Sequence, residues 1–138
     1  MTFLLQLLFG HLLFAFAFYG THRWVLHGFL GKIGPLKSLK KQHANHHRLP
    51  QDPGGLLFTK DLNALLLGCC SALSVLYPPV GIGAFLYLGL YTWRHRRAHS
   101  GAKDPTALHH LSHHYKSARK NFDIVYPFID KLLRTKAD

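Results

Sequence analysis

Histidine is the residue type in this chain whose number and spacing could do chemistry. The sequence holds 12 histidines and only six acidic residues. Ten of the histidines form two pairs and two triplets: His22 and His27; His43, His46 and His47; His95 and His99; His110, His113 and His114. Imidazole nitrogen is a common ligand for zinc, copper, iron and nickel. The pattern therefore predicts a metal centre.

The spacing within each group predicts where its rings point. Residues i, i+3 and i+4 of an α-helix share one face, so a helix through either triplet turns all three rings to one side, as a chelating cluster requires. The i, i+4 spacing of His95 and His99 has the same effect. Five residues, however, turn an α-helix by about 140°. We therefore expect the rings of His22 and His27 to diverge, so that each could serve a different metal.

Ten imidazoles are too many for one ion and sufficient for two, with about five each and positions left open for oxygen or water. Carboxylates are then expected behind the ligands, where they orient imidazole N–H groups. The candidates for this role are Asp52, Asp61, Asp104, Asp123 and Asp130. A loop-capping or turn role is equally open for each of them, above all for the two that precede proline, Asp52 and Asp104.

Two histidines stand apart from the four groups. His11 lies alone in an apolar run, where we expect it to be packed or hydrogen-bonded rather than a ligand. His109 adjoins a triplet and is expected to be a spare or an orienting group.

All six acidic residues of the chain are Asp, and Glu is missing. The lack of Glu excludes the soluble type of di-iron site, which uses Glu-x-x-His motifs.

The elements that must position these groups are predicted from the distribution of charge. Residues 1–21 and 62–93 carry no charged side chain, and an apolar run of about 20 residues matches the hydrocarbon core of a bilayer. Pro78 and Pro79 interrupt the second stretch. We predict an all-α integral membrane helical bundle with about three spans, at residues 2–20, 62–77 and 80–93. It forms a single domain over residues 1–138, capped by the histidine-bearing helices; a cleaved signal peptide is the weaker alternative for the first span.

The same charges predict the orientation of the chain. Residues 31–61 carry six Lys or Arg against two Asp, and residues 94–138 carry ten against four. Basic segments beside membrane spans favour the cytoplasmic side, so we expect a multi-pass protein whose histidine groups all face the cytoplasm. The net charge of +11 could instead indicate nucleic-acid binding. Anionic lipid headgroups explain basic residues beside apolar spans better, and no nucleic-acid partner is expected.

The order of the four groups, with a membrane hairpin between the second and the third, resembles the fatty acid hydroxylase and sterol desaturase superfamily of membrane di-iron enzymes. The resemblance covers about residues 19–135. It includes residues 21–28, 46–53, 120–124 and 130–133 and the doubled His109-His110, all similar to the fatty acid 2-hydroxylase branch. Short bacterial carotenoid hydroxylases are nearly as similar, through their length and through residues 22–28 and 60–62.

The resemblance implies two iron ions held by the ten grouped histidines, activation of O2, and hydroxylation or desaturation of an unactivated C–H bond in a membrane lipid. A fatty-acyl chain is the first expectation, and a carotenoid or sterol is the alternative. Zinc readily occupies imidazole sites and could replace iron on purification. A separate electron donor is also implied, either a cytochrome b5-like protein or a ferredoxin with its reductase. The chain departs from the family pattern at Asp123, where relatives commonly have Gly, and in having one N-terminal span where two are usual.

Other classes of metal protein remain open at this point. A metal or haem transporter should place several ligands within its spans, whereas only His11 lies there. A non-catalytic metal-binding protein is compatible with the same spacing. A hydrolase with two zinc ions is disfavoured because the chain has no Glu and therefore no His-Glu-x-x-His motif.

Overall fold

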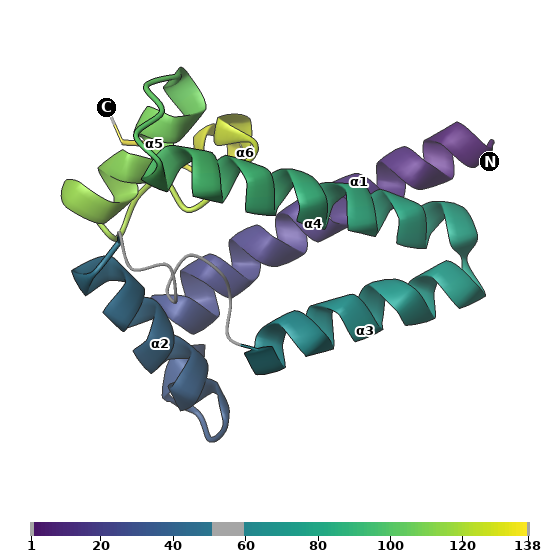
Figure 1. Ribbon diagram of the computed structural model, residues 1–138, viewed down its shortest axis with the longest axis horizontal. Helices are drawn as coiled ribbons and strands as arrows, with labels where there is room; N and C mark the ends of the chain where they lie inside the picture. Colours follow the sequence, from purple (N-terminus) through teal and green to yellow (C-terminus); the bar gives the residue numbers. More distant parts are fainter. Residues whose placement is uncertain (1, 51–59, 138) are drawn as a thin grey trace.

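The structure is a computed structural model that describes residues 2–50 and 60–137, and every regular element in those residues is a helix (Figure 1). In chain order the elements are α1 (Phe3–Gly20), the π-helix η1 (Thr21–Leu26), the 3-10 helix η2 (Leu30–Lys32), α2 (Leu36–Arg48), α3 (Lys60–Leu76), α4 (Pro78–His99), α5 (Pro105–Tyr115) and α6 (Pro127–Leu132). The predicted all-α class is confirmed.

The first predicted span is the part of the fold that best fits a membrane. Helices α1 and η1 run on as one apolar helix, Phe3–Leu26, whose 24 residues extend for about 36 Å. Within the described ranges it is the one helix long and apolar enough to cross a bilayer. Helix α3 is shorter, with 17 residues, and α4 ends in the charged segment from Arg94 to His99. The fold thus contains one candidate span, and three spans remain a proposal.

The predicted helical hairpin is present and turns at the prolines. Helix α3 ends at Leu76 and α4 begins at Pro78, a position where proline's missing amide costs no hydrogen bond. Figure 1 shows the two helices side by side, so that the start of α3 and the end of α4 point to the same end of the molecule. Helix α4 continues past the predicted limit of residue 93 to His99. The third histidine group is therefore a direct extension of the hairpin.

Helices α1 and α4 cross closely because glycine lies at their contact. A Cβ added to Gly10 would lie 2.2 Å from the carbonyl oxygen of Val80, and one added to Gly83 would lie 2.1 Å from that of Leu7. Small residues at such crossings let helix backbones approach, as they do in membrane helix pairs. Neither glycine stands out in the sequence by its local pattern.

A hydrophobic core beside this crossing ties both helices to the C-terminal segment. Its buried members come from α1, α3, α4 and residues 122–129: Phe14, Ala15, Phe18, Tyr19, Cys70, Ala84, Tyr87, Phe122, Val125 and Ile129. The histidine-bearing elements gather at one end of this body, where α2 and α5 lie in Figure 1, with α6 beside them. The fold thus has an apolar helical body and a histidine-bearing end.

Candidate metal centre

The ten grouped histidines converge into two clusters of five rings. Cluster A consists of His22, His27, His43, His47 and His113, and cluster B of His46, His95, His99, His110 and His114. Within each cluster one nitrogen from every ring lies within 4.8 Å of the corresponding nitrogens of the other four. Each cluster draws its rings from at least three separate elements, so neither exists before the chain has folded.

His22 and His27 lie in the same cluster, and the expectation that their rings diverge was wrong. Residues 21–26 form a π-helix rather than an α-helix, and the amide of His27 donates to the carbonyl of His22 at 3.1 Å. A π-helix has an i to i+5 hydrogen-bond repeat. Residues five apart therefore share one face, and the ring centroids of His22 and His27 are 5.1 Å apart.

Each triplet faces one side, as expected, but its rings are divided between the clusters. The outer pair of the first triplet, His43 and His47, belongs to cluster A, while His46 belongs to cluster B. In the second triplet the division is reversed, with His113 alone in cluster A. The rings of His47 and His114 stack across the boundary with centroids 4.2 Å apart. The two clusters therefore adjoin, and α2 and α5 each contribute to both.

The nitrogen positions fit a metal ion in each cluster. Neighbouring Nε2 atoms are 2.8–3.1 Å apart in cluster A and 3.0–3.2 Å apart in cluster B. An ion bound at 2.0–2.1 Å to each nitrogen separates ligands at right angles by about 2.9 Å and opposite ligands by about 4.1 Å. Both values agree with the observed spacing and with the 4.8 Å limit of each cluster.

Two rings of cluster A are held by backbone carbonyls of the C-terminal segment. The Nδ1 of His22 donates to the oxygen of Phe122 at 2.5 Å, and the Nδ1 of His113 donates to that of Lys120 at 2.7 Å. Because a carbonyl only accepts, the proton must be on Nδ1 and the lone pair on Nε2. Both rings thus present Nε2 to the cluster as free ligand atoms.

A comparison with protein families agrees with this geometry. The family model of fatty acid hydroxylases matches residues 7–135, which is nearly the whole chain. The chain belongs to the fatty acid hydroxylase family. Membership in this membrane-associated and typically iron-dependent family makes the protein an oxidoreductase. Neither the curated proteins nor the solved structures gave a match.

In this member of the fatty acid hydroxylase family, the surroundings of the cluster histidines favour their neutral form. Burial, together with the neighbouring imidazoles, lowers the pKa of His27 and His47 to about 3. Burial also lowers the pKa of His46, His99 and His113 to about 4. These rings are consequently neutral at pH 7, which is the form that binds metal.

Three of the five candidate carboxylates have described side chains, and none of the three bonds a ring of either cluster. Asp104 caps α5, accepting from the amides of Thr106 and Ala107, and Asp123 accepts from two loop amides of the C-terminal segment. Asp130 contacts His109, which belongs to neither cluster. Asp52 and the side chain of Asp61 lie outside the described residues. For His22 and His113, orientation comes from backbone carbonyls, which the sequence does not identify as special.

The two ungrouped histidines behave as the sequence predicted, outside the clusters. His11 hydrogen-bonds through Nε2 to the hydroxyl of Tyr126 at 2.5 Å and packs edge-on against the ring of Tyr87. His109 is buried on α5, where its Nε2 lies 3.0 Å from Oδ2 of Asp130. Of the adjacent His109 and His110, only His110 contributes a ring to a cluster.

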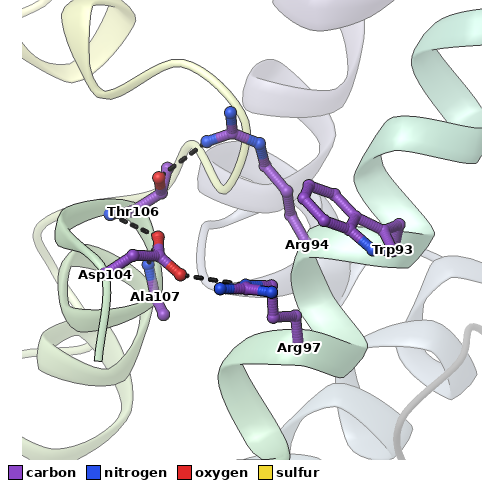
Figure 2. A pocket seen from close by; sticks show the side chains of 6 residues that line it. All are labelled: Trp93, Arg94, Arg97, Asp104, Thr106 and Ala107. Carbon is purple, nitrogen blue, oxygen red and sulfur yellow. Dashed lines mark hydrogen bonds and ion pairs between the residues drawn. The ribbon is translucent and has the colours of Figure 1, made fainter. Parts of the chain in front are cut away.

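Polar contacts with α4 fix the helix that carries the last triplet. Figure 2 shows a surface pocket between the two helices, bridged by Arg97 to Asp104 at 3.1 Å and by Arg94 to Thr106 at 2.7 Å. The amide of Ala107, with these partners, holds the pKa of Asp104 at about 2. These contacts set α5 against α4, which carries His95 and His99.

Proposed function

We propose that the protein is an O2-dependent di-iron hydroxylase of a membrane lipid, with a fatty-acyl chain as its substrate. The observation that carries this proposal is the pair of adjoining five-imidazole clusters, A and B, in a chain of the fatty acid hydroxylase family. All ten rings predicted as ligands fall into these clusters, so the proposed ligands are the ten grouped histidines.

Each cluster would hold one iron ion through its five imidazole nitrogens. When bound, the two ions supply activation of O2 for oxidation of an unactivated C–H bond. The chain itself positions the rings. Helices α2 and α5 each contribute rings to both clusters. The carbonyls of Phe122 and Lys120 fix the tautomers of His22 and His113. Electrons would come from a separate donor, a cytochrome b5-like protein or a ferredoxin with its reductase.

The surface of α1 supports a lipid as the substrate. Large apolar side chains stay exposed along it, including Phe9 at 53%, Leu13 at 46% and Phe16 at 40%. A helix that exposes several large apolar side chains is more stable in lipid than in water. The same helix continues into η1, which carries His22. A chain lying along α1 in the bilayer would thus end near the clusters.

The proposal is tested by measuring the masses of the lipids in a bacterial host that expresses the chain together with an electron donor. We expect lipids heavier by one oxygen, with the added atom derived from 18O2, in cells carrying the wild type. His46→Ala and His47→Ala, which remove one ring from each cluster, should abolish the product. Asn45→Ala, an exposed position on the same helix, is the matched control and should retain it.

The same measurement separates the alternatives. An oxidised carotenoid or sterol, in a host that makes it, would assign the substrate to another branch of the superfamily. A product lighter by two hydrogens would indicate desaturation. Unchanged lipids, despite bound iron and a competent donor, would favour a non-catalytic metal-binding protein. Transport is disfavoured because the cluster residues follow the long apolar helix α1 and end helix α4, rather than lining either helix along its length.

A further inference from the structure

Asp130 is a fully buried carboxylate that joins α5 to the C-terminal segment. Oδ2 accepts from Nε2 of His109 at 3.0 Å and from the amide of Asp123 at 2.8 Å. Oδ1 accepts from the amide of Phe122 at 2.8 Å and from Oγ1 of Thr135 at 2.7 Å. Four donors therefore converge on this one side chain, which is 0% exposed.

The backbone that Asp130 holds is the backbone that orients cluster A. The carbonyl of Phe122 accepts from His22, and the carbonyl of Lys120 accepts from His113. Between them, Asn121 has a φ of 56°, its amide donates to the carbonyl of Thr135, and its side chain bonds Ser112 of α5. Residues 120–123 are thus fastened on both sides, and their carbonyls are fixed in space.

Four of the five rings of cluster B lack such support from the described residues. The buried Nδ1 atoms of four of its rings, His46, His99, His110 and His114, have no hydrogen-bond partner. A ring whose second nitrogen is not held can rotate more freely, and metal affinity falls when such outer contacts are absent. The clusters are therefore unequal, because backbone carbonyls hold two of the five rings of cluster A, whereas four of the five rings of cluster B have an Nδ1 without a partner in the described part of the chain.

Building on the proposed metal centre, we infer that Asp130 is a positioning residue for cluster A, and that cluster A holds its ion more tightly than cluster B. His109 shares this role, because it is the side chain on α5 that binds Asp130. An asparagine at position 130 keeps the size of the side chain but presents an amide group to donors, so some of the four hydrogen bonds must break.

The experiment follows loss of Zn2+ from the full chain in detergent to an excess of a chromophoric chelator. We expect two bound ions per wild-type chain and two phases of release, the fast one from cluster B and the slow one from cluster A. His114→Ala should remove the fast phase, and His27→Ala the slow phase, which assigns them. Asp130→Asn should accelerate the slow phase by about 10- to 100-fold and leave the fast phase unchanged.

A second pair of variants tests the same contact without touching the carboxylate. His109→Gln retains an N–H donor near the position of Nε2, whereas His109→Leu has none. We expect His109→Leu to accelerate the slow phase and His109→Gln to restore most of the wild-type rate. This pair decides the inference if Asp130→Asn does not fold. Asp104→Ala, which removes the cap of α5, is the control for general weakening and should affect both phases alike.

Two results would overturn the inference. One is an equal acceleration of both phases by Asp130→Asn, which would reduce Asp130 to a general structural role. The other is an unchanged slow phase in both Asp130→Asn and His109→Leu. Either result would leave the proposed metal centre unchallenged. A wild-type chain that binds neither Zn2+ nor iron would overturn the proposed function as well.

Discussion

Asp123 is a buried carboxyl whose surroundings favour its protonated form. Its Oδ1 accepts from the amides of Val125 and Tyr126, whereas its buried Oδ2 has no hydrogen-bond partner among the described residues. Burial raises the pKa of this carboxyl to about 7, against the opposing effect of the two amides. Asp123 does not adopt a positive φ, whereas the described non-glycine residues Asn121 and Arg134 do.

The raised pKa predicts a pH-dependent difference between the wild type and Asp123→Asn. Between about pH 4 and pH 7 the folded state keeps a proton that the unfolded state releases, so the wild type loses stability as the pH rises through this window. Asparagine is uncharged at every pH. We expect the melting temperature of the metal-free Asp123→Asn chain to rise relative to the wild type between pH 5 and pH 8, measured in detergent.

Histidine protonation also alters stability over this range, but it is common to both proteins and cancels in their difference. Asp104→Asn is the matched control, because the pKa of Asp104 is already about 2 and the residue stays ionised from pH 5 to pH 8. If the melting temperatures of the wild type and Asp123→Asn change equally with pH across that range, the raised pKa of Asp123 is contradicted.

At the scale of the elements, the crossing of α1 and α4 depends on backbone contact rather than on side-chain packing. The Cβ of an alanine at position 83 would collide with a carbonyl oxygen of α1, and a backbone atom cannot move aside as a flexible side chain does. The helices would have to separate, which weakens the core beside the crossing. In contrast, Gly89 on the same helix has open space at the corresponding position.

This contrast predicts opposite effects for two alanine substitutions in α4. Gly83→Ala should lower the free energy of unfolding by about 1–3 kcal/mol, the usual cost of overpacking. Gly89→Ala should be neutral or should stabilise the helix by up to about 1 kcal/mol, because alanine is the better helix former. Thermal unfolding of both variants in one detergent measures the difference. Equal melting temperatures would mean that the two helices do not cross as closely as the structure indicates.

At the scale of the whole molecule, the chain separates an apolar helical body from a basic, histidine-bearing end. Val75, near the turn of the hairpin, is 82% exposed, and the exposed Lys103 lies near the clusters in the loop before α5. If the hairpin crosses the bilayer, these two positions lie on opposite sides. The proposed multi-pass topology, with the histidines in the cytoplasm, therefore depends on where these positions are accessible.

Cysteine labelling tests this topology in vesicles, in a chain whose Cys69 and Cys70 have been replaced by alanine. We expect Lys103→Cys to react with a membrane-impermeant maleimide in inside-out vesicles and not in right-side-out vesicles. Val75→Cys should show the reverse, or no reaction if the hairpin ends within the bilayer. Labelling of Lys103→Cys from the outer face would contradict the cytoplasmic placement.

Local pattern was enough to predict the helical class, the break at Pro78 and the ten histidines that meet, because periodicity and residue chemistry are properties of short segments. It failed for His22 and His27, since an α-helical turn was assumed where the chain forms a π-helix. The division of each triplet between clusters A and B was decided by tertiary structure alone, and only tertiary contacts distinguish Asp130 from the other carboxylates that the sequence offered. Those contacts join distant residues, such as His22 and Phe122, 100 positions apart, and no short-range pattern specifies such a pairing.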